Sequence, residues 1–380
     1  MSPRIDPPPL ASLTTMQVGA PATEHWRADS RDEIVEAAVQ AWSEHDRTVV
    51  LGGGSNIVAP GDADGGGFDG AIVQIASRGI QRVQTPTGDG VRLWIEAGHS
   101  WDDLVAQSVA EGWTGIEALS GIPGSVGAAP VQNIGAYGQE LASVLVSIEF
   151  LDEETGALQL VSAHDLRLGY RTSAIKEGRR GIVTAVELEL DPAADRASAV
   201  RYPQLATALG VPLGARVDGA SIREAVLELR RSKGMVLDAA DPASVGCGSF
   251  FVNPVVTAAI ARTLPEDAPR WPVGPGAADL PDIAVPLGDE PAEPNYGDGA
   301  PAVGADVKLS AAWLIERAGI GRGFTIPGLR AGVSPKHTLA IINLGGATAD
   351  DVLGMATYIQ TRVAAEFGVV LQPEPTILVP

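Results

Sequence analysis

The sequence predicts an α+β fold, with strands outnumbering helices in the first half of the chain. Short runs rich in β-branched residues recur from residue 48 onward, as expected of strands. Fewer segments carry apolar residues at helical spacing. The chain has 380 residues, enough for two or three domains, and no internal repeat recurs at a fixed period.

The predicted strands are short runs next to glycines or polar turns. They cover residues 48–51, 71–76, 91–98, 144–152, 181–190 and 338–343. The run 48–51 leads directly into three glycines, and the other runs are rich in valine, isoleucine and leucine. These runs make the first half of the chain mixed α and β, with more strands than helices.

Four helices are predicted, at 101–111, 221–234, 308–318 and 350–367. Ser100 with Asp103, and Ser221 with Glu224, have the spacing of capping boxes, so we expect the first two helices to begin there. The fourth helix carries one apolar face, formed by Val352, Met355, Ile359, Val363 and Phe367.

The net charge of −20 argues against nucleic acid and membrane surfaces as partners, because both are anionic. No apolar run is long enough to cross a bilayer, and the N-terminus lacks the apolar core of a signal peptide. The single cysteine, Cys247, cannot form an intramolecular disulfide, which fits a reducing compartment. We therefore expect a cytoplasmic protein, and a monomer. Two segments offer local positive charge for an anionic ligand: Arg167, Arg171, Lys176, Arg179 and Arg180, then Arg230, Arg231 and Lys233.

Two segments are expected to lack regular structure. Residues 1–12 begin with a proline-rich stretch and are predicted to be disordered. Residues 265–301 hold nine prolines, eight acidic residues and one basic residue. Such a composition buries little apolar surface, so residues 265–303 are predicted to be an inserted loop, with a lid as the less favoured alternative.

Two glycine-rich segments indicate a nucleotide site. Gly52–Gly54 follow a predicted strand and precede Ser55 and Asn56, and glycines let backbone N–H groups approach a pyrophosphate. This is not the GxGxxG fingerprint of a Rossmann unit. Residues 122–138 (IPGSVGAAPVQNIGAYG) combine glycines with a few amide side chains and no charge, which suits an extended dinucleotide better than a buried strand.

Three shorter motifs are weak when taken one at a time: GYRTSAIK at 169–176, GCGSFFVNP at 246–254 and LQPEPTI at 371–377. Together with the two glycine-rich segments, in this order, they resemble the UDP-N-acetylenolpyruvoylglucosamine reductases (the MurB family). The resemblance runs from about Leu13 to Thr376, outside the 265–303 insert. The insert and Cys247 depart from the usual pattern of the family, and neither belongs to its catalytic set.

The resemblance implies an FAD-binding fold of the vanillyl-alcohol-oxidase/PCMH type, followed by a MurB-type α+β substrate-binding domain. The expected organisation is an FAD-binding domain at 13–200, a substrate-binding domain at 201–370, and a C-terminal segment, 371–380, that returns to the active site. The implied activity is the NADPH-dependent, FAD-mediated reduction of UDP-N-acetylglucosamine enolpyruvate to UDP-N-acetylmuramate, in cell-wall synthesis. The preference for NADPH over NADH rests on the family alone, whereas non-covalent FAD is expected because the loop GGGSN has no histidine to carry a covalent link.

The resemblance also assigns residues. Arg171 matches the arginine beside the substrate carboxylate, Ser249 the proton donor, and Glu374 the C-terminal active-site glutamate. Tyr202, Lys233 and Asn253 match substrate contacts, Tyr202 being the tyrosine of type I members. The implied FAD contacts are Gly52, Gly53, Gly54, Ser55, Asn56, Gly124, Gly127, Gln132, Asn133, Gly135, Ala136 and Tyr137.

Three other functions are compatible with part of the sequence. An oxidase with covalent FAD is disfavoured because the loop GGGSN has no histidine to carry the link. A non-catalytic flavin-binding or nucleotide-binding module is disfavoured because Arg171, Ser249 and Glu374 occur together. A serine hydrolase is disfavoured because Ser249 lies outside a GxSxG motif. The five histidines have no metal-ligand spacing, so no metal is expected.

Overall fold

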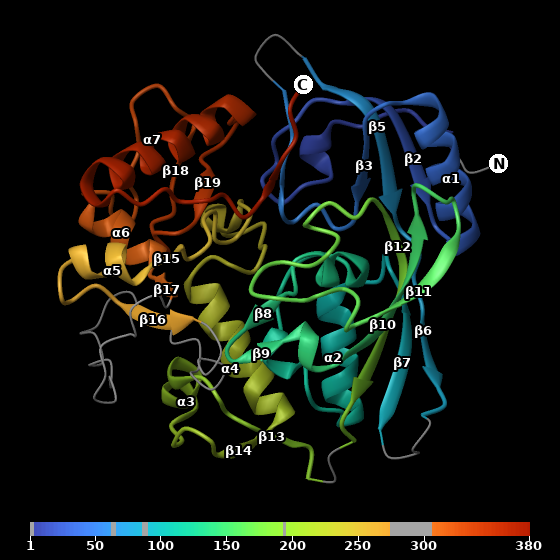
Figure 1. The fold of residues 1–380 in the computed structure, drawn as a ribbon, viewed down its shortest axis with the longest axis horizontal. Helices are drawn as coiled ribbons and strands as arrows, with labels where there is room; N and C mark the ends of the chain where they lie inside the picture. Colours follow the sequence, from blue (N-terminus) through green and yellow to red (C-terminus); the bar gives the residue numbers. More distant parts are fainter. Residues whose placement is uncertain (1–3, 62–65, 86–89, 193–194, 274–305) are drawn as a thin grey trace.

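The computed structural model describes residues 4–61, 66–85, 90–192, 195–273 and 306–380. Its N-terminal half holds two sheets and its C-terminal half a smaller α+β unit, which lie on opposite sides of the molecule in Figure 1. The predicted α+β fold is confirmed. Within the described residues, no helix is long and apolar enough to cross a membrane.

The first sheet has the order β1-β2-β5-β3. Strand β1 (Arg4–Ile5) is antiparallel to β2 (Ala22–Ala28), whereas β2 and β3 (Thr48–Leu51) are both parallel to β5 (Phe68–Ile75). Helix α1 (Arg31–Glu44) connects β2 to β3 and contacts both β2 and β5. The sequence analysis missed this helix, whose N-cap is Ser30.

The second sheet is antiparallel throughout, in the order β11-β10-β12-β7-β6. Its strands are β6 (Ile80–Val83), β7 (Val91–Glu96), β10 (Leu145–Asp152), β11 (Leu158–Ser162) and β12 (Gly181–Leu190). Helix α2 (Trp101–Glu111) follows β7 and has the predicted bounds, because the Ser100 side chain accepts the Asp103 N–H at 3.3 Å. One hydrophobic core joins the two sheets, α1 and α2.

The segment between α2 and β10 carries the second glycine-rich stretch. It contains the short hairpin β8 (Gly135–Ala136) and β9 (Gln139–Glu140). Three short 3₁₀ turns lie beside it, at Glu117–Leu119, Val126–Val131 and Leu141–Ser143.

A small helical unit follows the second sheet and lies low in the centre of Figure 1. It contains β13 (Ala197–Ala199), α3 (Pro203–Leu209), β14 (Arg216–Asp218) and α4 (Gly219–Ser232). The predicted capping box at Ser221 is wrong: the Asp218 carboxylate accepts the Ser221 N–H at 2.9 Å, so α4 begins at Gly219. An aspartate is as good an N-cap as a serine, and here it is the residue placed by β14.

The C-terminal unit has a sheet in the order β15-β17-β16 and a two-stranded sheet. Its strands are β15 (Val255–Thr257), β16 (Arg270–Val273), β17 (Asp306–Leu309), β18 (Ala331–Val333) and β19 (Ile341–Asn343), and its helices are α5 (Ala258–Thr263), α6 (Ala311–Arg317) and α7 (Ala349–Phe367). The predicted helix at 308–318 is too long, because Asp306–Leu309 pair with two strands and Ser310 caps α6. Helix α7 confirms the prediction at 350–367 and begins with a capping box formed by Thr348 and Asp351.

Two predictions of irregular structure need correction. Residues 4–12 are ordered: Arg4 pairs with Glu24 and lies over the Trp26 ring, and Leu10 is 1% exposed. The predicted insert begins later than residue 265, because β16 pairs with β17 and the Ala268 side chain lies in the C-terminal core. The rest of the predicted insert, 274–303, lies outside the described residues.

The C-terminal tail crosses back to the N-terminal half. Strand β20 (Thr376–Ile377) pairs in parallel with β4 (Ile57–Val58), which directly follows the first glycine-rich segment. Met16, Val18 and Val58 in turn contribute to the C-terminal hydrophobic core. Each half therefore contributes a segment to the other: the C-terminal tail pairs with a strand of the N-terminal half, and N-terminal residues pack in the C-terminal core. This exchange brings residue 374 close to residue 56.

Candidate active site

A cleft of about 1340 Å³ is lined by residues from both halves. Pockets for a single small ligand usually measure roughly 300–1,000 Å³, so this cleft has room for a cofactor and a substrate together. All predicted site residues line it except Gly127 and Asn133. A Cβ at Gly127 would lie 2.5 Å from Cβ of Ala97, so this glycine allows close backbone packing at the end of β7.

The two glycine-rich segments pack against each other as one wall. A Cβ added at Gly53 would lie 2.6 Å from Cα of Gly124, and the Ser55 hydroxyl donates to the Pro123 carbonyl at 3.0 Å. Only glycines permit this backbone contact. The resulting wall presents main chain to the cleft with few side chains, which fits an extended dinucleotide such as FAD.

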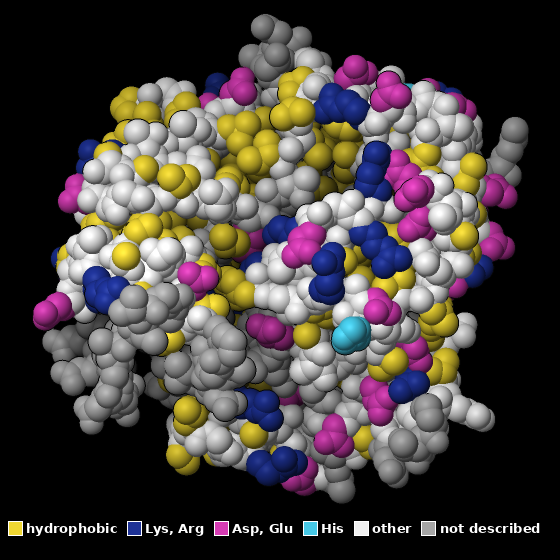
Figure 2. Space-filling model, viewed as in Figure 1, with side chains coloured by type: hydrophobic (Ala, Val, Ile, Leu, Met, Phe, Trp, Pro, Cys, Tyr) yellow, Lys and Arg dark blue, Asp and Glu magenta, His cyan; other side chains and the backbone are white. Residues whose placement is uncertain are grey.

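The cleft is positive although the protein is acidic. On the face shown in Figure 2, Lys and Arg side chains lie among Asp and Glu side chains, so the charge of the cleft follows from its lining residues. The cleft wall has two acidic residues, Glu140 and Glu374, and six basic ones: Arg171, Lys176, Arg201, Arg230, Lys233 and Lys308. Within low-dielectric walls this excess attracts phosphates and carboxylates. Four of the eight basic residues noted in the sequence line the cleft, and Arg167, Arg179, Arg180 and Arg231 do not.

Arg171 reaches the cleft from a tight turn. The Gly169 and Thr172 backbones exchange hydrogen bonds, and Arg171 within the turn has φ of 53°, in the left-handed region. Its Nη2 donates to the Gly135 carbonyl at 2.9 Å. Asn133 holds this turn from behind, because its Nδ2 donates to the Gly169 carbonyl at 3.1 Å. The buried Asn133 therefore supports Arg171 from outside the cleft wall.

A polar cluster surrounds the carboxylate of Glu374. Its Oε1 accepts from Gln132 Nε2 at 3.2 Å and lies 3.5 Å from Nε of Arg171. The Gln132 Oε1 accepts from Asn56 Nδ2 at 3.2 Å and from Lys176 Nζ at 3.5 Å. These contacts fix the direction of the Gln132 amide, whose N–H side faces Glu374. Burial lowers the pKa of Lys176, with Glu374 acting in the opposite direction.

Ser249 lies in the loop before β15, one residue from the pair Phe250 and Phe251. Both rings are at most 1% exposed. The Phe250 N–H donates to the Leu339 carbonyl at 2.7 Å, and the Phe250 carbonyl accepts the Glu374 N–H at 2.9 Å. The loop is therefore fixed between the C-terminal unit and the C-terminal tail. Within the described residues, no hydrogen bond occupies the Ser249 hydroxyl, which lines the cleft.

The end of α4 and the β8–β9 hairpin form the predicted substrate side. Tyr137 and Gly138 form the two-residue turn of this hairpin, with φ of 49° and 81°. The Tyr137 and Tyr202 rings meet edge-on, with their centroids 5.5 Å apart. Nζ of Lys233 lies 5.8 Å from the centroid of the Tyr137 ring. Burial, followed by the charge of Arg230, lowers the pKa of Lys233 to about 8.

Asn253, the third predicted substrate contact, also has a structural bond: its Oδ1 accepts the Ala311 N–H at 3.0 Å. Asn253 thus lines the cleft and also binds the first residue of α6.

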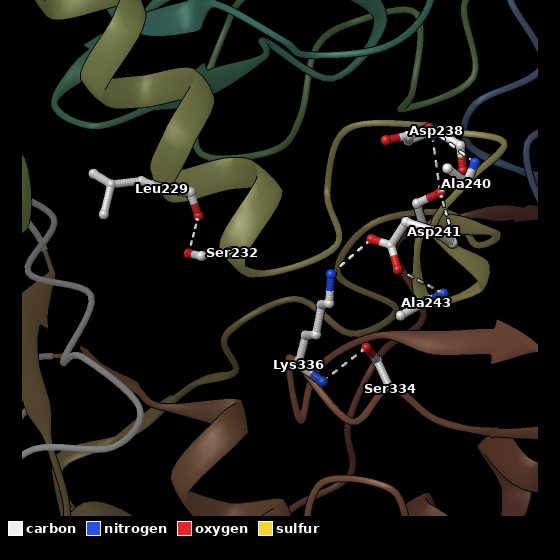
Figure 3. A network of polar contacts seen from close by, with 9 residues as sticks. Leu229, Ser232, Asp238, Ala240, Asp241, Ala243, Ser334 and Lys336 are labelled. Carbon is white, nitrogen blue, oxygen red and sulfur yellow. Dashed lines mark hydrogen bonds and ion pairs between the residues drawn. The ribbon is translucent and has the colours of Figure 1, made fainter.

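Polar contacts fasten the loop that runs from Lys233 towards Ser249 (Figure 3). Lys336 Nζ donates to Oδ2 of Asp241 at 2.8 Å. The Ser244 hydroxyl donates to the Asp238 and Asp241 carbonyls at 3.0 and 2.8 Å. The loop is thus held by hydrogen bonds within it and by an ion pair with the segment after β18.

Several cleft residues were missed from the sequence, among them Thr15, Trp271 and Lys308. Lys308 Nζ lies 4.8 Å from the Tyr170 ring centroid and 5.8 Å from that of Trp271, so it joins the two sides of the cleft. Trp271 was missed because it lies within the segment that was predicted to be an inserted loop. His337, noted but not chosen, also lines the cleft; burial lowers its pKa to about 3, so the imidazole is neutral.

Two other features fall outside this chemistry. The Cys247 thiol donates to the Ile57 carbonyl at 3.5 Å, and burial raises its pKa to about 12, so it is a poor nucleophile.

Potential ligand atoms of Glu24, Glu44 and His45 lie within 4.8 Å of one another in the described chain. Arg4 pairs with both glutamates, which makes this group an ion-pair cluster.

Comparison with known proteins identifies both halves. Residues 26–162 match the FAD binding domain family, and residues 241–378 match the C-terminal domain of UDP-N-acetylenolpyruvoylglucosamine reductase. The chain is 51% identical to the UDP-N-acetylenolpyruvoylglucosamine reductase of Leifsonia xyli, covering 98% of each, and 44% identical to that of Saccharopolyspora erythraea, covering 97% of this chain and 94% of the relative.

A solved structure agrees with these matches. The crystal structure of UDP-N-acetylenolpyruvylglucosamine reductase (MurB) from Thermus caldophilus aligns over 99% of both chains, with a TM-score of 0.60 and 25% identity. The predicted FAD-binding fold, the FAD cofactor and the class of FAD-dependent oxidoreductase using NADPH are confirmed. The chain belongs to the UDP-N-acetylenolpyruvoylglucosamine reductase family.

Proposed function

We propose that this chain reduces UDP-N-acetylglucosamine enolpyruvate to UDP-N-acetylmuramate, the reaction of its family in peptidoglycan synthesis, through Arg171, Ser249 and Glu374. One observation carries the assignment of these residues. Three motifs far apart in the sequence line one cleft, beside a glycine-rich wall that fits FAD. The glycine-rich wall would hold FAD, which would supply the hydride-transfer chemistry between NADPH and the vinyl group of the substrate.

Arg171 stabilises the charge that this transfer creates. Hydride addition at the terminal vinyl carbon leaves negative charge on the neighbouring carbon and its carboxylate. A guanidinium fixed by the Gly135 carbonyl and by Glu374 meets that charge without reorganising. Its planar fork can also hold a carboxylate through two parallel hydrogen bonds.

Ser249 delivers the proton that completes the reduction. Ser249 lines the cleft, and the basic carbon accepts the proton as charge builds up on it. The serine regains a proton from solvent. Hydride and proton together saturate the double bond, so the atoms and electrons of the substrate balance.

Glu374, Tyr202, Lys233 and Asn253 bind and orient the substrate in this proposal. Lys233 sits in the positive part of the wall, where a sugar nucleotide would bring its diphosphate. Glu374 is held by Gln132 and Arg171, which keeps its carboxylate fixed beside the reacting group.

The proposal includes a cytoplasmic monomer without a nucleic-acid partner. The charge of −20 supports the last point, and the single buried Cys247 is compatible with a reducing compartment. Light scattering on the purified protein, with and without added DNA, measures the mass and any complex.

An anaerobic absorbance titration tests the function. NADPH should bleach the flavin of the purified yellow protein, and the enolpyruvyl UDP-sugar should restore its absorbance. Acid precipitation should release the flavin into the supernatant. Failure of the UDP-sugar to restore the colour would reject the proposed substrate, and flavin that remained in the pellet would indicate a covalent link.

A further inference from the structure

Thr15 makes contact with both functional loops of the cleft. Its backbone N–H donates to the Gly54 carbonyl at 3.0 Å, in the first glycine-rich segment. Its hydroxyl donates to the Gly246 carbonyl at 2.7 Å, three residues before Ser249. The same oxygen lies 3.4 Å from the Ser55 carbonyl. The side chain is 8% exposed and lines the cleft.

The Ser249 loop is fixed differently at its two ends. Phe250, after Ser249, is held by Leu339 and the C-terminal tail. Gly246, before Ser249, accepts from the Thr15 hydroxyl, and Cys247 donates to the carbonyl of Ile57, which follows the first glycine-rich segment. The same end of the loop is also tied to β19, through a β-bridge between Gly246 and Ile342. Gly248 between the two anchors has φ of 71°, so this short connection already has an unusual backbone. Among these contacts, the bond from Thr15 to Gly246 is the one that ties the Ser249 loop to the residue bound to Gly54 of the glycine-rich wall.

We propose that Thr15 is a positioning residue, whose hydroxyl sets the distance between the Ser249 loop and the cofactor-binding glycine-rich segment. The inference rests on the proposed role of Ser249 and adds a residue to it. The hydroxyl bond to Gly246 is short and buried, so its removal leaves a buried carbonyl without this donor. The backbone bond to Gly54 survives any change of side chain except proline.

Three variants separate positioning from simple packing. Thr15→Val keeps the branched shape and removes the hydroxyl, whereas Thr15→Ser keeps the hydroxyl. Thr14→Val is the matched control: Thr14 is 7% exposed, and its hydroxyl reaches only the Val18 carbonyl of its own segment, at 3.5 Å. Each variant is measured by hydrogen exchange of residues 246–251, by thermal unfolding and by stopped-flow analysis of both half-reactions.

In Thr15→Val, the amide hydrogens of residues 246–251 should exchange with solvent about tenfold faster than in the wild type, as expected for the loss of one buried hydrogen bond. Reoxidation of the reduced flavin by the UDP-sugar should slow by about the same factor, while bleaching by NADPH stays unchanged. Thr15→Ser and Thr14→Val should behave as wild type in all three measurements.

Two results would overturn the inference: unchanged exchange at 246–251 in Thr15→Val, or an equal slowing of both half-reactions that follows a loss of thermal stability. If the wild-type enzyme itself does not transfer electrons to the UDP-sugar, the proposed function fails. The exchange experiment alone then decides whether Thr15 holds the loop.

Discussion

Nε of Arg171 lies 3.5 Å from Oε1 of Glu374, although the two residues are separated by about two hundred positions in the sequence. The side chains are 26% and 14% exposed, so the pair is neither fully solvated nor sealed. A substrate carboxylate that binds Arg171 must share the guanidinium with Glu374. The geometry of the guanidinium, and not only its charge, then decides how well both anions are held.

Arg171→Lys should slow reoxidation of the reduced flavin by the UDP-sugar by about 10²-fold, within the range for loss of a fixed donor to developing charge. An ammonium keeps the charge but cannot form the bidentate contact. Stopped-flow absorbance measures the rate. Arg167→Lys is the control on the same segment, because Arg167 lies outside the cleft wall and pairs with Glu177 at 3.4 Å. Equal rates in the two variants would remove Arg171 from its proposed role.

Ser249→Ala should separate the two half-reactions. Bleaching of the flavin by NADPH needs no proton donor at the substrate carbon and should survive. Reoxidation by the UDP-sugar should slow by about 10²–10⁴-fold, the usual cost of losing a positioned general acid. Ser249→Cys should recover part of the rate, because a thiol also gives up a proton. Near-normal reoxidation in the alanine variant would leave Ser249 as a loop residue only.

Affinity for the UDP-sugar should fall as the pH rises through about 8, because Lys233 then loses its charge. Its folded pKa lies below its ordinary value of 10.5, so the unfolded chain binds more protons between these values. The contribution of Lys233 to the free energy of unfolding therefore rises with pH in this window, opposite in sign to the loss of affinity. The pH profile of KM measures the effect, and Lys233→Arg should extend tight binding to higher pH. A profile unchanged by this substitution would point to another group.

Replacing residues 274–305 by Asn-Gly should leave folding and FAD binding intact. Val273 and Asp306 are direct cross-strand partners in β16 and β17, and a two-residue type I′ turn joins such a pair. The flavin spectrum and the thermal midpoint report on the fold. KM for the UDP-sugar reports on whether the removed segment contributes to binding. A variant that binds FAD normally but has lost affinity for the UDP-sugar would identify the segment as a lid.

The start of α2 and the buried face of α7 were predicted correctly, because local side-chain patterns determine both features. Ser100 caps α2 as its spacing with Asp103 indicated, and the apolar face of α7 is buried at Val352, Met355 and Ile359. The predicted starts of two helices were wrong, because pairing with a neighbouring strand sets the backbone at those positions. Asp218, placed by β14, caps α4 instead of Ser221, and residues 306–309 pair as β17 instead of beginning a helix.

The sequence alone was sufficient to predict the family and part of the cleft wall, because the motif residues lie in short local patterns that occur in one order along the chain. Only the tertiary structure decided how those residues act together. Gln132 could be read as an amide in a glycine-rich stretch, but its bonds to Asn56 and Glu374 depend on the β20–β4 pairing. Asn133, predicted to contact FAD, supports the Arg171 turn through its bond to the Gly169 carbonyl, a contact that the sequence did not indicate. Such contacts join positions remote in the sequence, and their geometry is set by packing between segments, which no local pattern encodes.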